Sequence, residues 1–274
     1  GYEIPPYTPL SPDQRTTALR LSALYRLAEN RGSFVLVISV ETLLRRVIHR
    51  SQLMGSAELL MAGEEFDLEE LRLQIAAIGY VEVSLVKNVG DFSVRGGILD
   101  IFPPAFSLAG EHLHEGPVRL DFFGDTIESI RSFDPFSQRS QEDLEEIIVL
   151  PVSDIIINSQ DKVGIGAIRS LLLEKAEQFH WAAEKTAEIN ERIQNGQRFP
   201  GAEFFLPLFN GESADPTSSV LDYLPEETLL VLLDPQAINR QAGIVHERIQ
   251  ANYNSALTSA TPALPSEEIF IPLN

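Results

Sequence analysis

Apolar residues recur with a helical period near the amino-terminal end of the chain. Residues 19–28 show this spacing behind Ser11 to Gln14, a segment typical of a helix start with Ser11 as N-cap. A continuous apolar run at 34–38 then predicts a strand buried on both faces, and a short helix is expected over 41–49. Helices that alternate with fully apolar strands are the pattern of an α/β domain.

The period changes to two between residues 81 and 150. A capped helix over 67–79 precedes this region. Turn residues divide the region into short runs, at Gly90-Asp91, Gly96-Gly97, Pro103-Pro104 and Gly124-Asp125. Short alternating runs separated by such turns predict a compact antiparallel sheet.

Helical spacing returns after Pro151. Residues 161–195 read as one long amphipathic helix, and residues 228–233 as a second fully buried strand before a helix over 236–252. Buried-type strands on both sides of a β-rich middle predict a discontinuous α/β domain. We expect it to comprise residues 1–57 and 152–274, with an inserted α+β module of antiparallel strands at 58–151.

Composition limits the chemistry of the chain. It has 40 acidic and 21 basic residues, a net charge of −19, and only four lysines, none of which follows a glycine. A P-loop needs a Gly-Lys pair, so no nucleotide site, cofactor or catalytic group is expected. Few clustered cations also disfavour a stand-alone DNA-binding domain. The absence of cysteine excludes disulfides and thiolate chemistry. No apolar run approaches the roughly 18 residues of a membrane span, so we expect a cytoplasmic piece of a longer protein.

Two weaker signals carry alternatives. The segment around His112 and His114 has the composition of a metal site, but a solvated loop is the favoured interpretation and no metal is predicted. A basic cluster at 45–50 is read as a solvated helix face, with contact to DNA phosphates as the alternative.

Period two places Arg119, Asp121 and Phe123 on one face of a strand, while Leu120 and Phe122 share the core face. Arg95 ends a neighbouring predicted strand, ahead of a sharp glycine turn. Pattern alone favours an Arg119–Asp121 ion pair with Phe123 covering the core edge. An exposed aromatic beside arginines is, however, also the composition of an interface hot spot.

The middle of the chain contains a long sequence motif of a known protein module. Residues 90–103, GDFSVRGGILDIFP, resemble a segment of the UvrB-homology module, and residues 119–134 continue it. This module is shared by the excision-repair helicase UvrB and the bacterial transcription-repair coupling factors. Flanking segments at 6–12, 201–209 and 221–226 are similar to the amino-terminal region of the coupling factors.

The resemblance implies a degenerate helicase-like, P-loop-NTPase-derived α/β domain that has lost its nucleotide site, with the inserted module intact. In that family Arg95, Arg119 and Phe123 match the surface that binds the damage sensor UvrA, and this reverses the preference for an ion pair. The implied function is non-catalytic mimicry of UvrB, which recruits nucleotide excision repair to a stalled RNA polymerase.

The rest of the parent protein is implied in the same way. It would be an ATP-dependent DNA translocase that binds RNA polymerase and double-stranded DNA through domains absent here. Its carboxy-terminal domain would mask the UvrA-binding face. The alternatives are a weak DNA-contacting module and a purely structural or autoinhibitory one.

Overall fold

The computed structural model describes residues 4–30, 33–106, 114–210 and 217–273. These residues form two compact units. Unit 1 holds residues up to 12, residues 26–52 and those from 161 onward, while unit 2 holds residues 13–25 and 53–160. The predicted boundaries at 58 and 151 stay a prediction, and each unit is described by itself.

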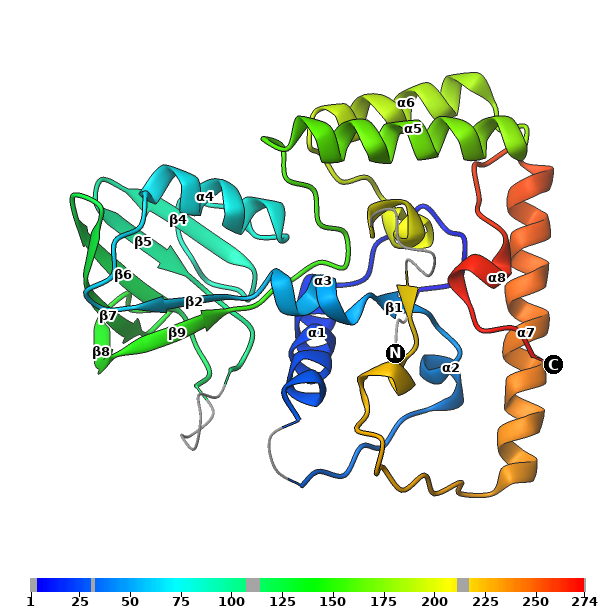
Figure 1. The fold of residues 1–274 in the computed structure, drawn as a ribbon, viewed down its shortest axis with the longest axis horizontal. Helices are drawn as coiled ribbons and strands as arrows, with labels where there is room; N and C mark the ends of the chain where they lie inside the picture. The colour runs from blue at the N-terminus through cyan, green and yellow to red at the C-terminus, as the bar shows by residue number, and fades with distance from the viewer. Residues whose placement is uncertain (1–3, 31–32, 107–113, 211–216, 274) are drawn as a thin grey trace. The chain divides into compact units, whose positions relative to one another are not determined.

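Unit 2 is built on a six-stranded sheet in the order β3-β4-β5-β6-β7-β8 (Figure 1). Its strands are β3 (Val81–Glu82), β4 (Asp91–Arg95), β5 (Ile98–Ile101), β6 (Val118–Phe123), β7 (Thr126–Phe133) and β8 (Ser140–Leu144). β3 and β4 are parallel and all other neighbours are antiparallel, so the sheet is mixed. A separate antiparallel pair joins β2 (Glu58–Met61) to β9 (Glu146–Val149).

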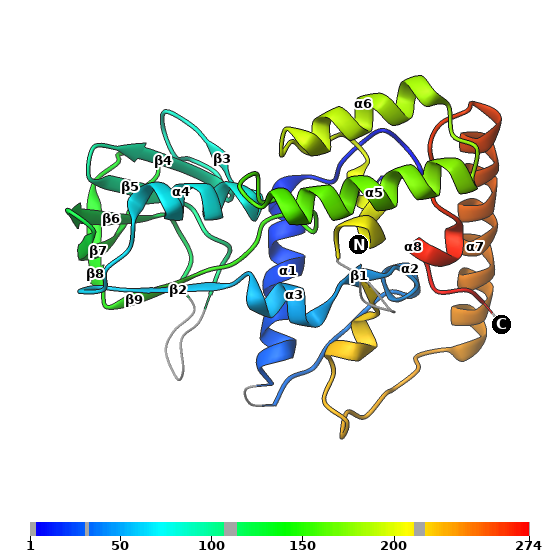
Figure 2. The same ribbon diagram turned by 45° about the horizontal axis from the view of Figure 1, so that its top comes forward.

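One face of this sheet packs a hydrophobic core. Helix α4 (Leu68–Ala77) starts at Asp67, whose carboxylate accepts a hydrogen bond from the Glu70 amide at 2.8 Å, as the capping pattern predicts. The helix buries Leu71 and Ile75 in one cluster with the core-facing side chains of the strands. Both views show α4 lying along the sheet (Figure 2).

Helix α1 (Gln14–Glu29) starts later than predicted. The carboxylate of Asp13, rather than the Ser11 hydroxyl, accepts the hydrogen bond of the Thr16 amide at 3.1 Å. Ser11 instead donates to Glu203 at 3.0 Å. The predicted N-cap is therefore wrong, because a long-range partner takes the hydroxyl that the local pattern assigned to the helix.

Unit 1 is mainly helical. Its elements include α2 (Val40–Leu43), α3 (Arg50–Gly55, which ends in unit 2), α5 (Lys162–Gln178), α6 (Ala183–Gln194), α7 (Pro235–Thr258), α8 (Ser266–Ile269) and the 3-10 helices η1 (Ala202–Phe209) and η2 (Val220–Tyr223). Helices α5 and α6 lie side by side in both views (Figures 1 and 2). Its only described strand pair is short, with β1 (Val47–Ile48) antiparallel to β10 (Thr217–Ser218).

The predicted helices of this unit are only partly confirmed. The expected helix at 161–195 is two helices, because His180 adopts φ 53° and the Trp181 amide bonds back to the Ala176 carbonyl at 2.9 Å, which ends α5. The helix expected over 41–49 is only the four residues of α2. The helix expected over 236–252 is confirmed within α7, behind an N-cap at Asp234.

The two predicted buried strands of this unit are wrong. Residues 34–38 and 228–233 form no strand, and most of them are exposed, with Val35 at 92% and Leu229 at 85%. An apolar run becomes a strand only when a neighbouring backbone pairs with it, and no strand in the described part of the chain does so. The fold is a mixed α/β structure whose regular sheet lies in unit 2. No described helix combines the length and apolarity needed to cross a bilayer.

Candidate functional site

Strand β6 carries the centre of the candidate site, and its two faces differ in chemistry. Leu120 is fully buried opposite Leu99 and Ile130, and Phe122 packs partly against the same core. Arg119, Asp121 and Phe123 alternate with them and lie on the other face. The period-two prediction for this strand is therefore confirmed.

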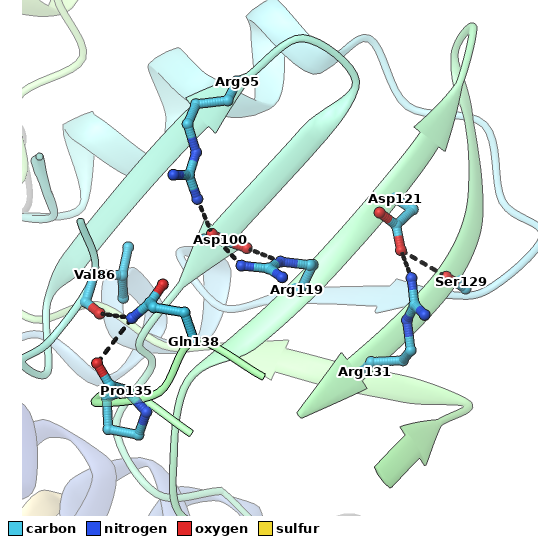
Figure 3. A network of polar contacts seen from close by, with 9 residues as sticks. All are labelled: Val86, Arg95, Asp100, Arg119, Asp121, Ser129, Arg131, Pro135 and Gln138. Atoms are coloured by element: carbon cyan, nitrogen blue, oxygen red, sulfur yellow. Dashed lines mark hydrogen bonds and ion pairs between the residues drawn. The ribbon is translucent and has the colours of Figure 1, made fainter. Parts of the chain in front are cut away.

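We call this second surface the outer face. It is made of alternate side chains from four adjacent antiparallel strands, namely Ser93, Arg95, Ile98, Asp100, Arg119, Asp121, Phe123, Ser129 and Arg131. The register places Asp100 opposite Arg119 and Asp121 opposite Ser129. Figure 3 shows the arginines, the aspartates and Ser129 of the outer face in two groups on these strands.

The first group centres on Asp100, whose side chain is completely buried. Its carboxylate accepts hydrogen bonds from Arg95 Nη2 at 2.6 Å, Arg119 Nε at 2.6 Å and Arg119 Nη2 at 2.9 Å (Figure 3). The hydrogen bonds to Asp100 raise the pKa of Arg119 above its usual value. The Arg119 guanidinium also lies over the Phe133 ring, 4.9 Å from its centroid. Two arginines from different strands thus converge on one buried carboxylate.

The second group centres on Asp121. Its carboxylate accepts hydrogen bonds from Arg131 and from the Ser129 hydroxyl, the latter at 2.9 Å. The Arg119–Asp121 ion pair that the alternation favours does not form, because Asp100 takes Arg119 and Arg131 takes Asp121. A strand's own alternation cannot rank these partners, since cross-strand neighbours lie as close as neighbours on one strand.

Phe123 stands at the edge of the outer face with 79% of its side chain exposed. It ends β6 and pairs with Thr126 across a turn at Gly124, which has φ 62°. The alternative in which Phe123 covers the core edge is therefore wrong. An aromatic held outward by a tight hairpin, on the same sheet face as two ordered arginines, suits a protein interface.

The hairpin that joins β4 to β5 follows Arg95 and touches β6 at Gly97. The Gly97 carbonyl accepts a hydrogen bond from the Phe122 amide at 2.6 Å, and a Cβ on Gly97 would come within 2.7 Å of the Phe122 carbonyl oxygen. Glycine is required at this point because the two backbones touch. Beside it a shallow hollow of about 570 Å³ opens, lined by residues that include Ile98, Glu128 and Asp143.

The weaker candidates receive little support. His112 lies outside the described residues, while His114 pairs with Phe106 in an isolated bridge. No group of three or more metal-ligating side chains occurs among the residues that the structure describes. The basic cluster is not one helix face, since Arg45 lies over the Phe204 ring and Arg50 donates to the Ala28 carbonyl at 2.7 Å.

Sequence reasoning missed Asp100 and Arg131 as members of the outer face. The signal for Asp100 was present, because Asp100 lies between the core residues Leu99 and Ile101 and therefore points, like Ile98, to the other face of the strand. An acidic residue at a strand position flanked by buried neighbours indicates a buried partner. The register that joins it to Arg119 could not be read from a single strand.

A small sheet with one face in the core and the other presenting ordered arginines and an exposed aromatic defines a protein-interaction module. Comparison with known families agrees, since residues 59–154 match the UvrB interaction domain. All four polar strands of the outer face lie inside this match.

Relatives extend the comparison to the whole chain. The transcription-repair-coupling factors of Myxococcus xanthus and Escherichia coli are each 33% identical to it over 98% of its length, and that of Staphylococcus aureus is 40% identical over 63%. The chain belongs to the transcription-repair coupling factor (Mfd) family, as its amino-terminal region with the UvrB interaction domain. It spans 22% of the length of the first two relatives and 14% of the third.

Proposed function

We propose that this chain binds UvrA through the outer face of its sheet and so recruits nucleotide excision repair to a stalled RNA polymerase. One observation carries the proposal. Within the matched UvrB interaction domain, Arg95 and Arg119 are held on the buried Asp100, and the 79%-exposed Phe123 lies on the same face of the sheet. A rigid, partly desolvated arginine pair that shares a face with an exposed aromatic supplies the anchors that dominate interface energies.

The physical basis of binding is preorganisation. Arg119 is fixed by two hydrogen bonds to Asp100 and by the Phe133 ring, so it loses little side-chain freedom when a partner docks. Phe123 gains the burial of a large apolar ring that water now surrounds. We assign Arg95, Arg119 and Phe123 as the UvrA-binding residues.

The chain acts in this proposal without catalysis. No lysine follows a glycine, so it lacks the phosphate-binding pair of a P-loop. In the bacterial cytoplasm, the parent protein would supply ATP-dependent translocation and the contacts to RNA polymerase and double-stranded DNA through other domains.

We further propose that unit 1 derives from a helicase-like, P-loop-NTPase-type α/β domain that lost its nucleotide site. The apolar runs at 34–38 and 228–233 support this, since each has strand composition and each leads directly into a helix.

The DNA-contacting alternative draws less support from the geometry. The basic residues at 45–50 are engaged within unit 1, as Arg46 Nε donates to the Glu267 carbonyl at 3.1 Å and Arg45 stacks on aromatic rings. A net charge of −19 opposes DNA further. A purely structural module would leave the exposed Phe123 unexplained.

Titration of purified UvrA with the chain tests the proposal. Arg119→Ala and Phe123→Ala should each weaken binding by about 2 kcal/mol or more, roughly 30-fold. Arg72→Ala is the matched arginine control, because Arg72 lies on helix α4, which packs on the opposite face of the sheet, and pairs there with Glu82 of β3. If the two site variants stay folded and bind as tightly as this control, the outer face is not the UvrA site.

A further inference from the structure

We infer that Asp100 is a positioning residue that holds Arg95 and Arg119 in the arrangement a partner carboxylate recognises. This inference rests on the proposed function, since it concerns how the same outer face recognises UvrA. Asp100 would not touch the partner itself, because its side chain is completely buried.

The geometry around Asp100 is that of an orienting hub. Its Oδ1 accepts the Arg119 Nε, and its Oδ2 accepts both the Arg119 Nη2 and the Arg95 Nη2, at 2.6, 2.9 and 2.6 Å. The pairing with Arg119 is therefore bidentate, which fixes the plane of that guanidinium. Arg95 is tied at one nitrogen only, so most of its donors point elsewhere.

The residues grouped around Asp100 carry more positive than negative charge. One carboxylate faces two guanidiniums, so the group carries one net positive charge. Arg95 keeps 49% of its side chain exposed, and Asp121, the outer-face carboxylate on β6, already pairs with Arg131. An incoming carboxylate would complete the group with charge-assisted hydrogen bonds to donors that Asp100 has already aimed.

Positioning and simple charge attraction predict opposite changes in binding affinity for one substitution. Asp100→Asn removes a negative charge from the outer face, so charge attraction alone would tighten binding to an acidic partner. If Asp100 acts by orientation, the same substitution weakens binding, because an amide oxygen cannot hold both guanidiniums and the arginines regain their freedom.

The experiment is a double-mutant cycle on the 274-residue chain with UvrA as the probe. Asp100→Asn, Arg119→Gln and the double variant are titrated, with thermal unfolding measured for each. We expect about a tenfold or greater loss for each single variant, and no further loss in the double variant beyond about threefold. A merely structural role of Asp100 would instead give losses that multiply.

Two more variants keep the test decisive. Asp100→Glu retains the charge but displaces both guanidiniums by a methylene, so it should also weaken binding. This variant provides the test if Asp100→Asn does not fold. Glu82→Gln removes the carboxylate that holds Arg72 outside the outer face and should leave binding unchanged.

The outcomes separate this inference from the proposed function. Unchanged or tighter binding by Asp100→Asn and Asp100→Glu, together with weaker binding by Phe123→Ala, overturns the positioning role and leaves UvrA recognition intact. If the wild-type chain does not bind UvrA, or if Phe123→Ala binds normally as well, the assignment of the outer face fails and the inference falls with it.

Discussion

Buried carboxylates in unit 2 are each matched with arginine. Asp100 holds Arg95 and Arg119, and the almost fully buried Asp154 pairs with Arg20 of helix α1. A carboxylate loses its hydration when it is buried, and only a charged, hydrogen-bonding partner compensates that loss. The two carboxylates differ in their surroundings, because the arginines that hold Asp100 lie on the outer face.

The Arg20–Asp154 pair gives a stability prediction. Arg20→Met should lower the free energy of unfolding by about 3 kcal/mol, because Asp154 keeps its buried charge and loses its ion-pair partner. Urea denaturation measures the change. The double variant Arg20→Met/Asp154→Asn should recover part of the loss, and a loss equal to that of the single variant would contradict the ion-pair explanation.

His114 gives a prediction for pH. Burial lowers its pKa below the ordinary value of 6.5, outweighing the Gly116 backbone hydrogen bond and the charge of Glu142. The unfolded chain therefore binds a proton at higher pH than the folded chain does, so this contribution is complete above about pH 6.5 and declines as the pH falls through the folded pKa. Thermal unfolding between pH 7.5 and 5 should show a smaller decline for His114→Gln than for the wild type. Equal declines would contradict the assignment.

Strands and helices with local signals were predictable, whereas those that depend on a distant partner were not. The capped helix at Asp67, the hairpin turn at Gly124 and the two faces of β6 follow from short-range patterns, and all are confirmed. Arg119 and Phe123 were placed correctly on one face of β6 for the same reason. The Asp100 hub required the register between β5 and β6, which no single strand contains.

The two apolar runs fail as strands for a related physical reason. Composition at 34–38 and 228–233 predicts burial on both faces, but burial needs a neighbour that the described residues do not provide. A helix carries its hydrogen bonds within itself, so α7 forms where it was predicted while the run before it stays unpaired.

These exposed runs predict an uncommon response to mutation. Val35→Thr and Leu230→Thr should change the free energy of unfolding of this chain by no more than about 0.5 kcal/mol, since both side chains are solvent-exposed. They should also reduce self-association in light scattering, because contiguous exposed apolar surface promotes association. Leu21→Thr, at a fully buried position, is the control and should destabilise strongly. A large destabilisation by Val35→Thr would place that run in a core.

The charge of the whole chain favours a protein partner over DNA. A net −19 repels phosphate, while the outer face gathers Arg95, Arg119 and Arg131 from three strands of one sheet. The net negative charge of the chain and the local arginines affect different partners, because salt screens charges that are more than about 8–10 Å apart. An acidic protein surface can approach the arginines closely, whereas an extended polyanion meets the whole field.

The parent protein adds a prediction about access. If a carboxy-terminal domain covers the outer face in the resting parent, the 274-residue chain should bind UvrA more tightly than the intact protein. The ratio of the two dissociation constants equals the inverse of the fraction of time that the face is uncovered in the parent. Side-by-side titration of the two proteins measures this. Equal affinities would count against masking and would leave the outer-face site itself unaffected.

If the outer face binds UvrA in place of UvrB, the chain and UvrB compete for the same site on UvrA. The chain should displace labelled UvrB from UvrA. Phe123→Ala should displace it about 30-fold less well, while Phe136→Ala should match the wild type. Phe136 is a fair control because its side chain is 91% exposed and it follows β7 at the end opposite the Phe123 hairpin. Failure of the wild-type chain to displace UvrB, or equal displacement by the two phenylalanine variants, would contradict the account.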